Sequence, residues 1–216
     1  MRIIELEKKD IEINLGRLYR RVMVGGKEEL PGWLLEQIEE CLDDIPIEPK
    51  CIFSFFDCKS DLEKNLILKN ESFQSSFLAK RFRFAEEIGL FISTVGYDAT
   101  TKSRQAYEER DGVKSLIYDS IGSEYAESTA DKIQKIIEDD IGYCIKRYSP
   151  GYNDWHISEQ EKIFKLIPGK EIGVILQENS FLMQPEKSIS AIIGYSDKKI
   201  QGCISCNQKD CDYKMK

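Results

Sequence analysis

The sequence predicts an α+β fold with a largely antiparallel sheet. Segments with helical periodicity and segments with strand character follow one another in blocks, whereas a doubly wound parallel sheet requires strict alternation. The chain also has neither a glycine-rich phosphate loop of the Walker type nor a dinucleotide-binding fingerprint. With 216 residues, 41% of them hydrophobic, the chain is long enough to bury a substantial core.

Two amphipathic helices are expected near the start of the chain. Residues 8–23 have apolar side chains at helical spacing, with Asp10 as the expected N-cap and an end near Gly25 and Gly26. Residues 31–45 repeat the pattern behind a proline, which is typical of a helix start. Because no linker divides the chain, we expect one domain over residues 1–216, with residues 1–50 as a candidate helical N-terminal subdomain.

Strands are expected to follow these helices. Residues 50–58 and 61–70 are short and rich in Ile, Leu and Phe, which predicts a β-hairpin. Residues 72–88 return to helical spacing, and residues 89–96 are typical of a buried strand. The apolar positions of the predicted 72–88 helix are Phe73, Phe77, Phe84 and Ile88.

The middle of the chain is predicted to be helical from residue 100 to about residue 140, with a break near Gly112. One side of the second helix has small residues, so another element is expected to approach it closely. The small residues are Gly122, Ser123, Ala126, Ser128 and Ala130, and the predicted buried positions are Ile117, Ile121, Ile133 and Ile137. On this helix Glu127, four residues before Asp131, can line a cleft and accept a hydrogen bond from an ammonium group, although a solvated helix glutamate has the same pattern.

The last third of the chain is expected to contain a short helix from Ser158 and three short strands at 171–177, 180–184 and 188–196. Alternation in the last of these places Ser188 and Ser190 on one face and apolar residues on the other.

The segment "RYSPGYNDW", residues 147–155, combines an arginine, a rigid turn and aromatic residues. Pro150 and Gly151 fit the central positions of a type II turn, since proline presets its φ and glycine accepts a positive φ. Arg147 offers a planar fork of donors to a carboxylate, while Tyr148, Tyr152 and Trp155 offer flat faces to a heterocycle or a cation. The alternative is a surface turn with an ordinary salt bridge and half-buried aromatic residues.

The charge balance argues against nucleic acid as a partner. Lysine and arginine number 31 against 38 acidic residues, a net charge of −7. No apolar run approaches the roughly 20 residues that span a bilayer, and the N-terminus becomes charged too soon for a signal peptide. We therefore expect no membrane association and a cytoplasmic protein.

Seven cysteines, an odd number, do not indicate a disulfide framework, and four of them lie in apolar contexts. Residues 198–216 form a Cys-containing tail in which Cys203, Cys206 and Cys211 have the spacing C-x2-C-x4-C. An iron-sulfur cluster or a zinc ion is a candidate ligand, but a closed site needs a fourth donor, such as Asp210 or the distant Cys144. A reduced tail without a metal fits the pattern equally well.

Three segments together resemble the activation (reactivation) domain of cobalamin-dependent methionine synthase, in its short stand-alone form. They are residues 118–131, 147–155 and 182–197, and they occur in the order and at roughly the distances typical of that family. The resemblance implies a twisted, mainly antiparallel sheet with long flanking helices and a shallow groove for S-adenosylmethionine.

The resemblance also implies a ligand site and partners. Arg147 matches an arginine suited to the methionine carboxylate, Glu127 a glutamate suited to the ammonium group, and Tyr152 a tyrosine near the adenosyl or sulfonium end. The implied binding residues are Glu127, Arg147, Tyr148, Ser149, Pro150, Gly151 and Tyr152. The implied function is reductive methylation of an oxidised cobalamin carried by a partner, either a corrinoid-binding protein or a methionine synthase lacking its own activation domain. The implied electron donor is a flavodoxin or a ferredoxin.

Two other functions remain open from the sequence. The C-terminal cysteines can make the protein an iron-sulfur or zinc-binding electron-transfer or sensor protein. Alternatively, the chain is a non-catalytic interaction domain that has kept the fold and lost the ligand. Independent turnover by the isolated chain is not expected, because a reactivation module acts on its partner's cofactor.

Overall fold

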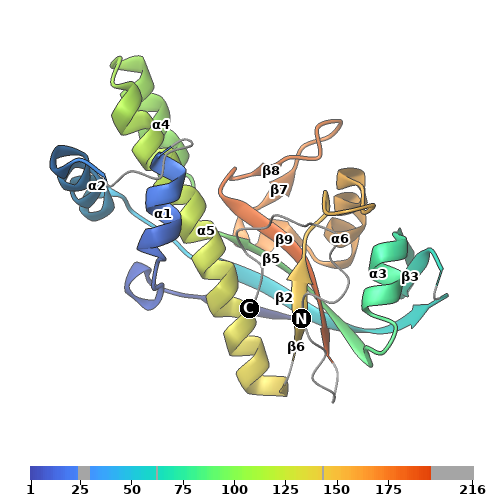
Figure 1. Ribbon diagram of the computed structural model, residues 1–216. Coiled ribbons are helices and arrows are strands. Elements are labelled where there is room, and N and C mark those ends of the chain that lie inside the picture. Colours follow the sequence, from blue (N-terminus) through green and yellow to red (C-terminus); the bar gives the residue numbers. More distant parts are fainter. Residues whose placement is uncertain (24–29, 62, 143, 196–216) are drawn as a thin grey trace.

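The computed structural model describes residues 1–23, 30–61, 63–142 and 144–195. Its main feature is a seven-stranded sheet in the order β4-β3-β2-β5-β9-β6, with β1 beside β2 (Figure 1). Every strand pairing among the described residues is antiparallel, which confirms the predicted α+β class. The strands of this sheet are β1 (Arg2–Glu5), β2 (Lys50–Ser60), β3 (Asn65–Leu68), β4 (Glu71–Gln74), β5 (Glu87–Thr94), β6 (Cys144–Tyr148) and β9 (Ser188–Tyr195). A separate two-stranded sheet consists of β7 (Ile175–Leu176) and β8 (Met183–Gln184).

Helices flank the sheet and extend beyond one end of it. They are α1 (Leu15–Val22), α2 (Gly32–Asp44), α3 (Ser76–Arg81), α4 (Asp98–Glu108), α5 (Gly112–Ile141) and α6 (Gln160–Leu166), with 3-10 turns η1 (Lys8–Asp10), η2 (Ile157–Glu159) and η3 (Gly169–Ile172). The long α5 and the break before Gly112 agree with the sequence prediction.

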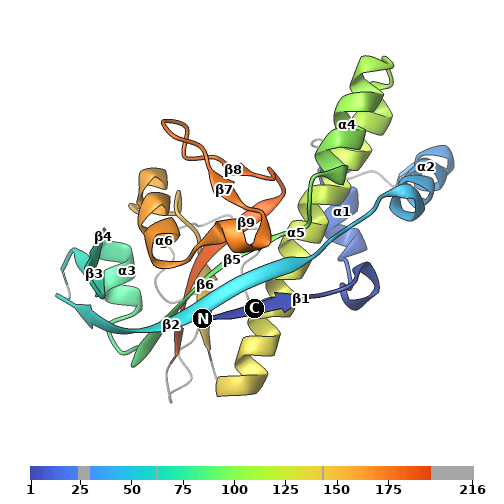
Figure 2. The same cartoon turned by 180° about the vertical axis from the view of Figure 1, so that it is seen from behind.

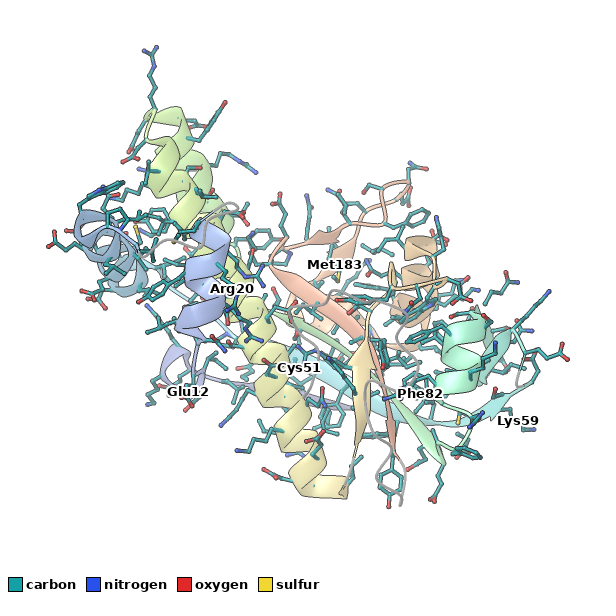
Figure 3. The ribbon with its side chains drawn as sticks, viewed as in Figure 1. Glu12, Arg20, Cys51, Lys59, Phe82 and Met183 are labelled. Carbon is teal, nitrogen blue, oxygen red and sulfur yellow. The ribbon has the colours of Figure 1, made fainter. Side chains whose placement is uncertain are left out.

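The C-terminal half of α5 covers one face of the sheet (Figure 1). Ala130, Ile133 and Ile137 of α5 pack on apolar side chains of the central strands, including Cys51 of β2, which Figure 3 labels near this helix. Alternation along β9 directs Ile189, Ala191 and Ile193 to this face, as the sequence predicts. The apolar stripe of α5 therefore holds the helix against the sheet.

The opposite face is covered by α3, α6 and the 3-10 turn η3. Their apolar side chains form one cluster with residues of β2, β5 and β9. This cluster includes Trp155 and also Phe82, which Figure 3 labels. The sheet thus has a hydrophobic core on each side.

The N-terminal half of α5 packs against α1, α2 and α4 rather than the sheet (Figure 2). The expected close approach to its small residues occurs at Gly122, where an added Cβ would lie 2.5 Å from the Cβ of Ala99 on α4. Ile11, Leu18 and Ile38 from the first 50 residues join this cluster.

Helix α1 begins later than the sequence predicts. Its N-cap is Asn14, whose side chain accepts a hydrogen bond from the Arg17 N–H, whereas Asp10 ends the short turn η1 and accepts from the Glu7 N–H. The prediction of Asp10 as the N-cap was wrong. Aspartate and asparagine are both good N-caps, and it is Asn14 that caps this helix. The expected end at Gly25 and Gly26 lies outside the described residues.

The predicted helix over residues 72–88 was also wrong. Phe73 lies in β4, Ile88 lies in β5, and only Ser76–Arg81 is helical between them. Phe84 is 64% exposed, so it takes no part in the expected apolar stripe. The two buried residues reach the core from strands on either side of α3, and their helical spacing is coincidental.

Other strand predictions hold with adjusted boundaries. β2 and β3 form the predicted hairpin, and β5 matches the strand expected at 89–96. Of the strand expected at 171–177 only Ile175 and Leu176 are extended, because η3 occupies its first part. The short helix expected from Ser158 begins as η2 and continues as α6.

Candidate functional site

The segment 147–155 contains the predicted rigid turn. The Tyr152 N–H donates to the Ser149 carbonyl at 3.3 Å, and Gly151 has φ +97°, as a type II turn requires. The Gly151 N–H donates to the Trp155 carbonyl at 2.7 Å, which closes the segment on itself. Positive φ at Gly151 is therefore confirmed, and Pro150 beside it is buried.

Asp154 and Trp155 attach this segment to the body of the protein. The Asp154 carboxylate accepts hydrogen bonds from the Ser75 and Ser76 hydroxyls and from the Ser76 N–H at 2.8 Å, at the start of α3. Burial alone would raise the pKa of Asp154, but these hydrogen bonds outweigh it and lower that pKa. Trp155 is 1% exposed and packs edge to face on Phe73.

The three aromatic side chains of the segment therefore differ in their availability to a ligand. Trp155 lies in the core, so the prediction that it offers a free flat face was wrong. Tyr148 is half-buried between Phe77 and Phe82, with edge-to-face contacts to both rings. Tyr152 is 60% exposed, and its ring is accessible at the surface.

Arg147 lies against α5 and contacts the glutamate predicted to share its site. One terminal nitrogen of Arg147 donates to Glu127 Oε2 at 3.0 Å, and the other donates to Asp131 Oδ1 at 2.6 Å. The Arg147 side chain is only 16% exposed, whereas that of Glu127 is 42% exposed. The structure thus brings Arg147 and Glu127 together, and it adds Asp131 as a partner that sequence reasoning did not assign to the site.

Two local features aim Arg147 at α5. Glu127 and Asp131 are four residues apart on the helix, so their side chains share one face. On β6 the register with β9 shifts between Ile145 and Tyr148, which places Arg147 within a β-bulge on this strand of the sheet. A bulge reorients side chains relative to the pleat.

A second group of charges lies one turn away on α5. Glu124 has a side chain that is 0% exposed, and its Oε1 accepts from Arg17 Nε at 2.9 Å, the Asn14 N–H at 3.1 Å and the Ser128 hydroxyl at 3.1 Å. Arg21 Nε lies 3.5 Å from the other carboxylate oxygen. This buried ion pair ties α1 to α5, and no sequence spacing indicated it.

The charges of Arg147 and Glu127 suit a small zwitterion. Arg147 and Glu127 present a cation and a carboxylate side by side at the edge of α5. An α-amino acid carries an ammonium and a carboxylate on one carbon, so it can pair with both side chains without leaving a net charge behind. This is the chemistry that the geometry supports best.

Two surface hollows are lined by Glu7, Lys8, Lys9, Ile11 and Tyr125 and by residues of β1, β2 and the end of α5, and neither includes Arg147 or Tyr152. The groove implied by the resemblance therefore stays a prediction.

The predicted metal ligands Cys203, Cys206 and Cys211 lie outside the described residues. Within residues 1–23, 30–61, 63–142 and 144–195, no group of three or more His, Cys, Asp or Glu side chains is arranged to hold a metal ion. His156, the one histidine of the sequence, accepts from the Ser158 N–H at the start of η2. In the same part of the chain no helix is long and apolar enough to span a membrane.

Comparison with known proteins places these observations in a family. Residues 36–211 match the family described as "Vitamin B12 dependent methionine synthase, activation domain". The fold is similar to that in "Crystal Structure of the MetH Reactivation Domain bound to AdoHcy", with a TM-score of 0.70 and 16% sequence identity, over 93% of this chain and 80% of that chain. No curated protein matches the sequence.

Proposed function

This chain belongs to the family of vitamin B12-dependent methionine synthase activation domains, and we propose that it binds S-adenosylmethionine and supports reductive methylation of an oxidised corrinoid on a partner protein. The observation that carries the proposal is the Arg147–Glu127 pair, held 3.0 Å apart beside a rigid turn. A relative of similar fold has been crystallised with AdoHcy, which supports an adenosyl ligand of the same class.

The ligand's amino-acid group exchanges partners with this ion pair. Its carboxylate accepts from the Arg147 guanidinium, and its ammonium donates to the Glu127 carboxylate. Breaking the contact between Arg147 and Glu127 leaves Arg147 paired with Asp131, and water can replace the lost contact at Glu127, whose side chain is 42% exposed. The charge-assisted contacts that replace it are worth more in a partly desolvated site.

The turn supplies the rest of the proposed site. Tyr152 is exposed at its end and offers its ring to the adenosyl or sulfonium part of the ligand. Tyr148, Ser149, Pro150 and Gly151 form the backbone between this ring and Arg147. Because backbone hydrogen bonds close the segment, the backbone positions from which Arg147 and Tyr152 extend are held relative to each other, which favours binding of an extended ligand.

An oxidised corrinoid returns to its methylated form when it receives one electron from a donor and a methyl cation from S-adenosylmethionine. S-adenosylmethionine is a strong methyl donor because the group that leaves is a neutral thioether. The residues of this chain bind and orient the ligand so that its methyl group faces the partner's corrinoid. The proposed partner is a corrinoid-binding protein or a methionine synthase without an activation domain of its own. The proposed electron donor is a flavodoxin or a ferredoxin.

Calorimetry with three related ligands tests the proposal. S-adenosylmethionine and S-adenosylhomocysteine carry the amino-acid group, whereas 5′-methylthioadenosine lacks it. We expect the first two to bind more tightly than the third. Arg147→Ala should reduce that difference, because the carboxylate contact is lost, while leaving the affinity for 5′-methylthioadenosine unchanged. Lys146→Ala is the matched control, because Lys146 is an exposed cation next to Arg147 on β6.

A wild-type protein that binds none of the three ligands would contradict the proposal. A protein that binds all three equally would keep an adenosine site but exclude the role assigned to Arg147 and Glu127. Reactivation of an oxidised corrinoid protein, followed by its visible absorbance with and without this chain, then tests the second half of the proposal.

A further inference from the structure

Arg17 of α1 touches the same carboxylate as Arg147. Its two terminal nitrogens both donate to Asp131 Oδ2 at 3.0 Å, while Arg147 donates to Asp131 Oδ1 at 2.6 Å. Asp131 therefore lies between two guanidinium groups, one from the N-terminal helix and one from β6. The two arginines are joined through a single side chain on α5.

Arg17 itself is held firmly. Its side chain is 18% exposed, and its Nε donates at 2.9 Å to the buried Glu124. Burial alone would lower the pKa of Arg17, but hydrogen bonds and charge from Glu124 and Asp131 outweigh it and raise that pKa, so the group stays cationic. The Asp131 side chain, by contrast, is 48% exposed and would sample other rotamers without a partner.

The geometry points to Arg17 as a positioning residue for Arg147. Arg17 donates to one carboxylate oxygen of Asp131, and one terminal nitrogen of Arg147 donates to the other oxygen. The second terminal nitrogen of Arg147 therefore faces Glu127. Without Arg17, Asp131 is free to pair with both terminal nitrogens of Arg147. That arrangement would withdraw the guanidinium from the place where the ligand carboxylate must bind.

This inference rests on the proposed function and extends it to a part of the chain outside the family match. That match begins at residue 36, whereas α1 ends at Val22. The N-terminal segment therefore contributes to the ligand site without contacting the ligand.

Arg17→Lys and Arg21→Lys make a matched pair for the test. Both residues lie on α1 and both approach Glu124, but among the contacts recorded for the described residues only Arg17 also reaches Asp131. A lysine keeps a charge for Glu124 but cannot reproduce the fork that spans Glu124 and Asp131. We expect Arg17→Lys to weaken S-adenosylmethionine binding by about five- to tenfold, the scale of coupling within one network, and Arg21→Lys to leave it unchanged.

Adding Asp131→Asn to the wild-type, Arg17→Lys and Arg21→Lys proteins separates an effect that reaches Arg147 through Asp131 from a general disturbance of α1. In an Asp131→Asn background, Arg17→Lys should cause no further loss, because the connection to Arg147 is already broken. Equal losses from Arg17→Lys and Arg21→Lys, or an undiminished loss in the Asp131→Asn background, would overturn the inference. Thermal unfolding of every variant checks that the folded state is retained.

Failure of this inference is distinguishable from failure of the proposed function. If wild-type protein binds S-adenosylmethionine and Arg17→Lys binds it equally well, only the positioning role is lost. If wild-type protein does not bind it, the proposed function fails, and the side-chain Nε–H NMR signal of Arg147 still decides the positioning role. That signal should shift in Arg17→Lys and stay in place in Arg21→Lys. A signal that is unchanged in both variants would overturn the positioning role of Arg17.

Discussion

Residues 147–152 and residues 154–155 lie in one segment, but their side chains face different surroundings. Asp154 accepts a hydrogen bond from the first residue of α3 and Trp155 lies in the core, whereas Arg147 pairs with carboxylates of α5 and Tyr152 is exposed. The second part is fixed to the body of the protein, and the first part contains the residues of the proposed site. A short binding loop keeps its geometry when buried anchors close to it remove its freedom to move.

The largest expected effect comes from removing the anchor. Trp155→Ala deletes a fully buried ring and should lower the free energy of unfolding by about 3–5 kcal/mol. Denaturant unfolding measures the change, and Trp33→Ala, at a tryptophan that is 55% exposed, is the control with little expected effect. A loss below about 1 kcal/mol for Trp155→Ala would contradict the distinction between the two parts.

Removing Arg147, by contrast, should affect ligand binding more than stability. Arg147→Ala should weaken S-adenosylmethionine binding by about 1.5–3 kcal/mol, the scale of a hydrogen bond to a charged group. The free energy of unfolding should change by no more than ~1 kcal/mol, because the ion pairs are partly exposed. Arg147→Lys should recover only part of the affinity, since lysine cannot make two parallel contacts. Calorimetry beside unfolding shows whether the two effects separate.

The contribution of Asp154 to the free energy of unfolding should depend on pH. Asp154→Asn should cost about 1 kcal/mol of stability, because a neutral amide loses the charge-assisted part of the hydrogen bonds from Ser75 and Ser76. Asp57→Asn, at an exposed carboxylate of β2, is the control. The pKa of Asp154 in the folded protein lies below the ordinary 3.8. Its contribution is therefore complete above that pH and is lost as the pH falls through the lowered pKa.

Acid titration of the folded protein shows whether this carboxylate acts as stated. The wild-type protein should lose the Asp154 contribution below about pH 4, and Asp154→Asn should lack that part of the acid dependence. The same acid dependence in both proteins would show that the ionised Asp154 carboxylate does not stabilise the fold.

The turn itself should be sensitive to a single methyl group. Gly151→Ala should destabilise the protein by ~1 kcal/mol and weaken ligand binding, because alanine is strained at φ +97° although the nearest atom to an added Cβ is 3.9 Å away. Gly112→Ala is the control, since Gly112 begins α5 with open space around it and no positive φ. Equal effects of the two substitutions would contradict the strain argument.

The smallest effect is expected at the C-terminal cysteines, which lie outside the described residues. Replacing Cys203, Cys206 and Cys211 with serine should change S-adenosylmethionine affinity by no more than about 0.5 kcal/mol, as for distant, independent sites. Loss of ligand binding in a folded variant would show that the tail closes over the ligand. Metal analysis of anaerobically purified protein tests the alternative of an iron-sulfur or zinc site.

The sequence by itself determined those structural features that depend on interactions between residues near one another in the chain. Positive φ at Gly151 follows from a Pro-Gly pair, and the long α5 follows from its periodicity, so both were predictable. That Arg147 and Glu127 share one site was indicated only by resemblance to a family, because the two residues come from different elements, and their direct contact was not predicted.

Tertiary structure decided the features that depend on residues far apart in the sequence. Asp154 finds Ser75 across 79 positions, and Arg17 finds Asp131 across 114. The burial of Trp155 and the bulge that aims Arg147 likewise depend on which strands and helices become neighbours. A residue's charge and shape limit the contacts it can make, but only the packed chain selects which partner lies within the few ångströms over which hydrogen bonds and ion pairs act.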